Sequence, residues 1–317
     1  MTTATAQAIA PDATGAARAQ LNENGYVVIE GLLPPATVRD LKARVDALLA
    51  HEREHPFEPG DGPPAPGDDR FCNDFGPFVA DRDEQARVMR RIRADRHREF
   101  DTPWPVAPEE VCISFFHLPT IFDDGRSQRI FNLINKDAAF APLLEHPALL
   151  AIIDAELGRD AVLLDVSVNN VGGHTDSGGW HIDSPITQVP EPLPEFTLSI
   201  QSVWMLDDFS AANGATHVAR GSHRTRRKPP KGKTPLDTEV VLEGPAGSLA
   251  IWLSQTWHRH GENTTDTART GVIAQYGRAW VKPFVDLRSP LTRDSAARFS
   301  PRLRYMMGCN ANAPVRG

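Results

Sequence analysis

The segment Gly178-Gly179-Trp180-His181-Ile182-Asp183-Ser184-Pro185 places an imidazole and a carboxylate two residues apart. On a β-strand, residues i and i+2 point to the same face, so His181 and Asp183 would project together while Ile182 packs on the other side. The flanking glycines and Pro185 predict that this strand is short. A histidine nitrogen and a carboxylate oxygen on one face supply two ligands of a 2-His-1-carboxylate triad, which holds Fe(II) and leaves coordination positions open.

The third ligand has to come from another part of the chain, because an isolated His-X-Asp tripeptide also suits a plain surface strand. Residues 257–261 follow the apolar run 247–253, where a late strand would return past the first one. His258 and His260 lie two residues apart and could face the same way, so their spacing does not choose between them. The downstream candidates are His217, His223, His258 and His260.

A second His-X-Asp tripeptide, His174-Thr175-Asp176, competes with the first. It lies among Gly172, Gly173, Ser177 and further glycines, a context that does not favour a strand. Metal ligands are best held on rigid elements, so we interpret His174 and Asp176 as part of a polar loop over the site.

An arginine that could bind a carboxylate follows the last histidines in the sequence. An oxygen-activating iron enzyme of this type needs an organic co-reductant, commonly a dicarboxylic keto acid, and a planar guanidinium binds a carboxylate through two parallel hydrogen bonds. Arg269 lies eleven residues beyond His258, on a strand that could run antiparallel beside it. The alternative for Arg269 is an ordinary solvent-facing position.

Composition limits the function classes. The formal net charge is −7 among 317 residues, so we expect no general attraction to nucleic acid or to an anionic membrane surface. Three scattered cysteines without CxxC spacing indicate free thiols in a reducing compartment. No signal peptide or long apolar run is visible, and we therefore expect a soluble, cytoplasmic protein.

The expected elements change character near residue 160. Before it, apolar periodicity predicts helices over 15–24, from 35 onward, over 81–100 and over 138–157, with strands over 25–31 and 111–117 and a loop or lid over 51–69. After it come short strands, and residues 162–170 alternate apolar and polar side chains, which predicts one packed and one cavity-facing side. These later strands are expected over 162–170, 181–183, 196–206, 215–219, 239–242, 247–253, 257–261 and 269–277.

This order of elements predicts a mainly β fold with flanking helices. The simplest architecture is one β-barrel or double-sheet jelly roll with the N-terminal helices on its outside. We expect residues 1–15 to be disordered and 16–317 to form a single domain, because no linker or repeat divides the chain.

Four separated segments resemble the phytanoyl-CoA dioxygenase-like group of Fe(II)/2-oxoglutarate-dependent dioxygenases. They are the Trp-His-Ile-Asp of 180–183, residues 203–223 with Asn-Gly-Ala-Thr and Gly-Ser-His, residues 247–252, and residues 256–269. Residues 24–34 also resemble the family's first strand and helix. The resemblance implies a double-stranded β-helix (jelly-roll or cupin-like) core.

Carried over residue by residue, the resemblance makes His181, Asp183 and His258 the iron ligands and Arg269 the partner of the far carboxylate of 2-oxoglutarate. His260 then stands where the family often has Gly or Ser, and His223 belongs to a turn. Trp204 and Asn169 fall near positions that line the 2-oxoglutarate pocket in relatives. The implied cofactors are Fe(II), 2-oxoglutarate and O₂, and the implied reaction oxidises a substrate C–H bond, most simply by hydroxylation, with release of succinate and CO₂.

Two other interpretations stay open at this level. The same three ligands would suit Zn or Mn in a metal-binding β-barrel without oxygenase activity. The basic stretch 223–233 could bind an anionic partner such as a nucleotide-bearing thioester or nucleic acid, or be a solvated surface loop. We expect the loops 51–69, 115–129 and 185–196 to govern substrate choice. Their composition suggests a small, moderately apolar organic molecule of the kind found in secondary metabolism.

Overall fold

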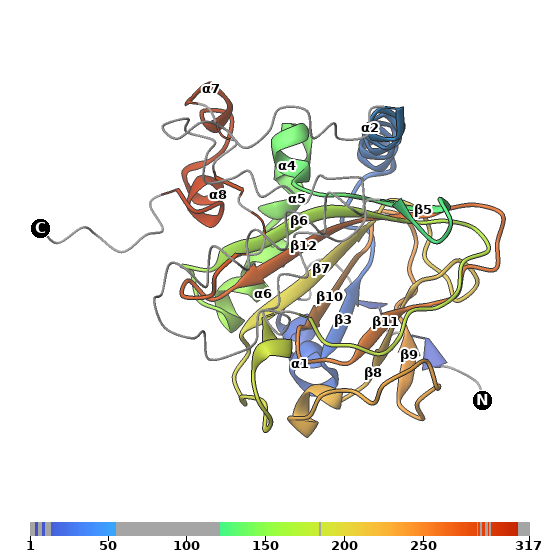
Figure 1. Cartoon of the computed structure of the whole chain (residues 1–317). Coiled ribbons are helices and arrows are strands. Elements are labelled where there is room, and N and C mark those ends of the chain that lie inside the picture. The colour runs from blue at the N-terminus through green and yellow to red at the C-terminus, as the bar shows by residue number, and fades with distance from the viewer. Residues whose placement is uncertain are drawn as a thin grey trace, which may run out of the picture.

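The fold is seen in a computed structural model of the chain (Figure 1). The structure describes residues 14–54, 121–183, 185–283 and 293–309, four single residues between 285 and 291, and the backbone at 4–5 and 8–9. The helix expected over 81–100, the strand over 111–117 and residues 55–69 of the expected lid lie outside the described residues.

A large, almost entirely antiparallel sheet forms the base of the fold. Its strand order is β2-β3-β10-β7-β12-β6-β5-β4, and of these neighbours only β2 and β3 run parallel. The strands are β2 Ala8–Ile9, β3 Tyr26–Ile29, β4 Ile121–Phe122, β5 Ser127–Ile130, β6 Val162–Val171, β7 Ser199–Met205, β10 Leu249–Leu253 and β12 Arg269–Gly277.

A smaller sheet faces the large one and completes a double-sheet jelly roll. Its strand order is β1-β9-β8-β11, with β8 pairing antiparallel to both β9 and β11. The strands are β1 Ala4–Thr5, β8 Thr216–Ala219, β9 Glu239–Val241 and β11 His258–His260. The predicted mainly β jelly-roll fold is confirmed.

Helices from the N-terminal half and the C-terminal end pack on the side of the large sheet that faces away from the small one (Figure 1). Leu21 and Val45 from the first two helices are buried against sheet residues such as Val166. The helices are α1 Thr14–Asn24, α2 Pro35–Glu54, α4 Leu133–Lys136, α5 Ala141–Leu144, α6 Pro147–Glu156, α7 Arg293–Ala296 and α8 Pro301–Met306, with 3-10 turns η4 Ala138–Phe140, η5 Ile186–Gln188 and η6 Ser222–Thr225.

The single helix expected over 138–157 is wrong, because the chain bends by 55° between α5 and α6. Pro147 has no N–H to donate and disfavours a helical conformation at His146, which is extended at ψ 129°. The His146 ring instead accepts a hydrogen bond from Ala148 and caps α6. Among the described helices none is by itself long and apolar enough to cross a bilayer, while this bent pair meets that test by length and composition only.

The alternation predicted for residues 162–170 is confirmed. Val166 and Val168 on β6 face the helices and are fully buried there. Asn169, whose side chain points the opposite way, lines a pocket between the two sheets. The inner face of the large sheet is therefore partly polar, as a binding cavity requires.

One expectation about a short strand needs correction. Residues 181–183 do not form a strand: His181 makes a single bridge to His258, and the chain then leaves the ladder as Asp183 N donates to Ser254 O. At the N-terminus, the dipeptides 4–5 and 8–9 pair with β9 and β3. The rest of 1–13 lies outside the described residues.

Gly25 joins α1 to β3 and is the basis of a stability prediction. Its φ is +88°, and an added Cβ would lie 2.5 Å from Thr256 Oγ1 and 2.6 Å from His223 Nδ1. We expect Gly25→Ala to lower the free energy of unfolding by about 1–3 kcal/mol, which is the cost of a strained backbone conformation. Urea unfolding would measure it. Gly15→Ala is the control, because a Cβ there meets nothing within 4 Å, and an equal loss in both variants would contradict this account.

Candidate metal centre

Two histidines from distant segments are held side by side by the backbone. His181 N donates to His258 O and His258 N donates to His181 O, both at 2.9 Å. Asp183 follows two residues after His181, and one potential ligand atom from each of these three side chains lies within 4.8 Å of the others. The structure thus brings together the three residues that the sequence selected as ligands, although only one of them lies on a regular strand.

Both imidazoles are oriented by their own backbone. His181 Nδ1 is 2.9 Å from Gly179 O, and His258 Nδ1 is 2.9 Å from Thr256 O. A carbonyl only accepts, so each Nδ1 carries the proton and each Nε2 keeps a free lone pair. Hydrogen bonds of this kind fix the ring and its tautomer in metal-ligating histidines.

The electrostatics of the three side chains suit a cation. The His181 ring is open toward the pocket, yet burial by the surrounding protein and the neighbouring His258 lower its pKa to about 4, so it is neutral at pH 7. Burial alone would raise the pKa of Asp183, but the adjacent His258, through its charge and its proximity to the carboxylate, outweighs burial and the pKa is lowered. Burial would lower the pKa of His258, but the adjacent Asp183 carboxylate raises it.

The donor set fits Fe(II). Asp183 Oδ2 is buried, lies 3.3 Å from His258 Nε2, and has no hydrogen bond among the described residues. A carboxylate oxygen left in this way is costly unless a cation compensates it. Two imidazole nitrogens and one carboxylate oxygen on one side of an open pocket are the donor set of non-haem Fe(II) oxygenases.

Arg269 is a buried cation without an ion-pair partner among the described residues. Only 3% of it is exposed, its Nη2 donates to Gly214 O, and its guanidinium lies 4.3 Å from the Phe209 ring centroid. Burial lowers its pKa to about 10, so it remains charged at pH 7. Its Nε has no hydrogen-bond partner. The pocket therefore contains a guanidinium ready to bind an anion.

The ligands and Arg269 share one cavity of about 370 Å³ between the two sheets. Asn169 also lines it, and its Oδ1 is buried without a hydrogen-bond partner in the part of the chain that the structure describes, as expected of a residue that contacts a bound molecule. Sequence reasoning missed several lining residues, although the alternation along β7 and β12 could have revealed those on the inner face. The missed residues are Gln201, Val203, Thr216, Trp252, Arg259 and Ile273, whereas Phe122 and Arg129, which also line the cavity, lie in the segment 115–129 that we expected to govern substrate choice.

Trp204 does not belong to this pocket, which corrects its predicted cofactor role. On β7 the neighbouring Val203 lines the cavity, so Trp204 points to the opposite face of the sheet. There it is fully buried in the helix-side core, and its Nε1 donates to Leu143 O at 3.1 Å.

A conservative change at Trp204 distinguishes a role in core packing from a role in cofactor binding. We expect Trp204→Phe to lower the free energy of unfolding by about 1–3 kcal/mol, because the buried Leu143 carbonyl loses its donor. The KM for 2-oxoglutarate should stay the same. Chemical denaturation and a steady-state assay measure both quantities, and a raised KM with unchanged stability would restore the cofactor role.

The competing histidines have other partners. His174 Nε2 is 2.8 Å from Asp266 Oδ1 outside the ligand group, which agrees with a loop role. His217 contacts Glu239, and His223 Nε2 is 3.1 Å from Asn22 O beside the turn after α1. His260 lines the pocket but is not in the ligand group, and its Nδ1 lies 3.2 Å from Gly261 O.

The basic stretch 223–233 lies against acidic residues of the same chain. Arg226 forms an ion pair with Glu195 at 2.7 Å, and Lys233 Nζ is 3.6 Å from Asp176. These contacts favour the interpretation of 223–233 as a surface loop, and not as a site for an anionic partner.

Comparison with curated proteins finds two informative relatives. An uncharacterized protein of Mycobacterium tuberculosis is 28% identical over 167 residues, which cover 49% of this chain and 57% of that protein. Ectoine dioxygenase of Nocardia farcinica is 24% identical over 190 residues, covering 50% of this chain and 63% of the relative. The chain thus spans less than two thirds of the length of these curated relatives.

Solved structures show the same fold at low identity. The non-heme alpha ketoglutarate dependent epimerase SnoN from nogalamycin biosynthesis is 17% identical, with a TM-score of 0.53 over 86% of this chain and 87% of SnoN. A nickel complex of the non-heme monooxygenase ThoJ is 16% identical, with a TM-score of 0.50 over 85% of this chain and 80% of ThoJ.

A family model matches both segments of the chain that hold the site residues. It matches residues 21–271 and therefore includes the His181-to-Asp183 segment, His258 and Arg269. The order of the motifs and the fold agree with this match. The chain belongs to the phytanoyl-CoA dioxygenase (PhyH) family.

Proposed function

We propose that this protein is an Fe(II)- and 2-oxoglutarate-dependent dioxygenase that hydroxylates a C–H bond of a small organic molecule. One observation carries the proposal: the triad of His181, Asp183 and His258 opens onto the same cavity as the unpaired, buried Arg269. A metal-binding barrel of another kind, holding Zn or Mn without oxygenase activity, has no need of that guanidinium.

Each residue has a defined task in this proposal. His181 and His258 bind iron through Nε2 while their Nδ1–H groups stay on backbone carbonyls, and Asp183 contributes Oδ2. Arg269 binds the far carboxylate of 2-oxoglutarate, and Asn169 contacts the same molecule. When bound, Fe(II) with 2-oxoglutarate and O₂ supplies oxidative decarboxylation to succinate and CO₂ and the oxidising power for a C–H bond.

The cavity walls support this chemistry by limiting water. Val203, Trp252 and Ile273 provide apolar surface between the two sheets, close to the ligand residues. A dry, shaped cavity is the contribution that proteins make to metal-centred oxidation. Asp183 also bears on the reaction type: related halogenases have a small residue at this position so that a halide can bind iron, and the carboxylate therefore favours hydroxylation.

The relatives support a small-molecule substrate. One is named a dioxygenase of ectoine, and SnoN has a structure in complex with Fe3+, alpha ketoglutarate and nogalamycin RO. Both names refer to small organic molecules. We infer the same general class for this chain, which includes secondary metabolites.

Anaerobic reconstitution tests the proposal. Purified protein with one equivalent of Fe(II) and excess 2-oxoglutarate should develop a visible metal-to-ligand charge-transfer band, and admission of O₂ should bleach it and form succinate. Succinate formation above the uncoupled background then screens substrates. Tight Zn(II) or Mn(II) binding, with neither the band nor succinate formed under Fe(II), would establish the non-oxygenase alternative.

A further inference from the structure

The two histidine ligands lie on backbone segments whose neighbouring residues face outward. His181 and His258 form one antiparallel bridge and point into the pocket. Side chains alternate along extended backbone, so the side chains of Trp180 and Arg259, each one residue away from a ligand, are directed to the other side of the small sheet, although Arg259 still borders the cavity. There the Arg259 guanidinium stacks on the Trp180 ring, 4.9 Å from its centroid. The contact between Arg259 and Trp180 thus joins the two ligand-bearing segments on the side opposite to the histidine rings.

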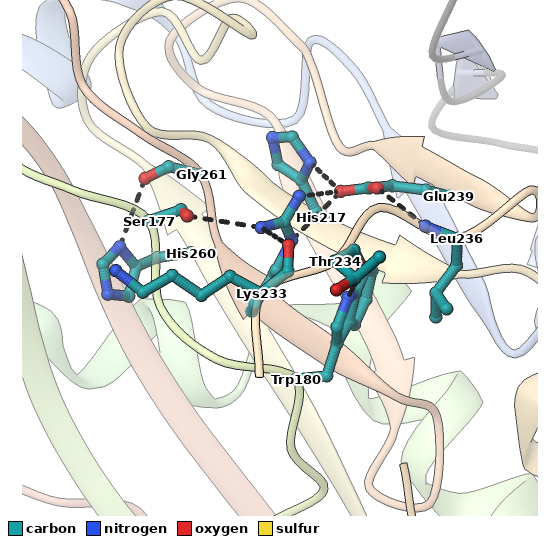
Figure 2. Close-up of polar contacts among 10 residues, drawn as sticks. Ser177, Trp180, His217, Lys233, Thr234, Leu236, Glu239, His260 and Gly261 are labelled. Carbon is teal, nitrogen blue, oxygen red and sulfur yellow. Dashed lines mark hydrogen bonds and ion pairs between the residues drawn. The ribbon is translucent and has the colours of Figure 1, made fainter. Parts of the chain in front are cut away.

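A buried carboxylate holds that guanidinium in place. Glu239 on β9 is 4% exposed, and its Oε1 accepts from Arg259 Nε at 3.0 Å and from Nη2 at 2.5 Å. The same oxygen is 2.6 Å from His217 Nδ1, and Leu236 N donates to Oε2. Figure 2 shows His217 and Leu236 on either side of the Glu239 carboxylate. The carboxylate has no freedom to move independently of β8 and β9.

The remaining donors of Arg259 reach two loops. Nη1 donates to Lys233 O at 3.1 Å and to Ser177 Oγ at 3.3 Å, while Trp180 Nε1 donates to Thr234 O at 2.8 Å. Figure 2 shows Ser177, Lys233, Thr234 and Trp180 gathered around this point. Arg259 therefore adds a side-chain link between the loop that precedes His181 and the strand that carries His258, beside the backbone hydrogen bonds that already join them.

We propose that the outer-face cluster of Arg259, Glu239 and Trp180 positions the two histidine ligands for iron. These are positioning residues, because they act through the backbone of His181 and His258. Ordinary packing would stabilise the sheet without setting the spacing of the ligands. Here, loss of the guanidinium fork should let the Trp180–His181 segment shift against β11. The inference rests on the proposed metal function.

The variants Arg259→Lys and Glu239→Gln test it. A lysine keeps the charge but has no planar fork, so it cannot bind Glu239 through two nitrogens while stacking on Trp180. We expect the Kd for Fe(II), titrated anaerobically at 20 °C, to rise by about 10-fold or more, in the range found when contacts that support ligands are removed. The charge-transfer band with 2-oxoglutarate should also shift or weaken.

A stability-matched control distinguishes positioning from packing. Val240→Ala removes buried volume from β9 within the core between the sheets, and Val240 pairs with β8 and β1, not with either ligand-bearing segment. Well below the melting temperature both proteins are folded, so a purely structural effect leaves the Kd for Fe(II) unchanged. A Kd for Arg259→Lys equal to that of Val240→Ala would overturn the inference.

A double-variant cycle adds an independent check. If Arg259 and Trp180 act through their mutual contact, Arg259→Lys combined with Trp180→Leu should weaken Fe(II) binding by less than the product of the two single effects. Strictly multiplicative effects would contradict the proposed cluster. If the unaltered protein fails to bind Fe(II), the proposed function fails first, which separates that outcome from failure of this inference.

Discussion

Replacement of Asp183 by alanine is expected to weaken Fe(II) binding by more than about 100-fold, beyond the range seen for residues that only support metal ligands. The change removes the only carboxylate in the ligand group and leaves two imidazoles without a negatively charged partner there. Without the negative charge, the site loses both a bond and the main electrostatic attraction for a divalent cation. Anaerobic Fe(II) titration measures the affinity, and succinate formation should fall to background.

The second His-X-Asp tripeptide provides a matched control for that experiment. Asp176 is exposed and interacts with Lys233, away from the ligand group. Asp176→Ala should bind Fe(II) as the unaltered protein does. If Asp183→Ala binds as tightly as Asp176→Ala, Asp183 is not a ligand.

Arg269→Gln is expected to raise the Kd for 2-oxoglutarate by roughly 10- to 150-fold, because hydrogen bonds to charged groups contribute about 1.5–3 kcal/mol. Fe(II) affinity should change little, since Arg269 is not in the ligand group. The charge-transfer band, titrated with 2-oxoglutarate at saturating Fe(II), reports this Kd directly. Arg269→Lys should be intermediate, because it keeps the charge and loses the fork.

Arg278 is the control for this prediction because it is also a largely enclosed arginine near the same strand. Its donors bind the carbonyls of Thr197, Leu157 and Glu156, outside the pocket. Arg278→Gln should cost stability and leave the 2-oxoglutarate Kd unchanged. An unchanged Kd in Arg269→Gln would remove the co-substrate role and favour the metal-binding barrel without oxygenase activity.

The candidate ligands could be found from the sequence because their signal is local and chemical. His181 and Asp183 need only two residues of extended backbone to face one way, and the structure keeps that arrangement although the segment makes a single bridge. The choice of His258 over His260 did not rest on a local signal. Spacing left it open, and only the resemblance of several motifs in order resolved it.

Other features depend on packing that no local pattern records. Trp204 and Val203 are adjacent in an apolar strand, and which of them faces the pocket follows from the register of β7 against β10 and β12. Arg129 lies in a segment expected to be a loop, and it lines the pocket because β4 and β5 form a hairpin beside β6. The break at Pro147 was readable in principle, but continuous apolar character favoured one helix.

The most direct test is a crystal structure of the protein grown anaerobically with Fe(II) and 2-oxoglutarate, with diffraction recorded on both sides of the iron absorption edge. The account predicts one anomalous peak bonded to Nε2 of His181, a carboxylate oxygen of Asp183 and Nε2 of His258, with the far carboxylate of 2-oxoglutarate on Arg269. An iron peak elsewhere, or one bonded to fewer than these three side chains, would contradict it.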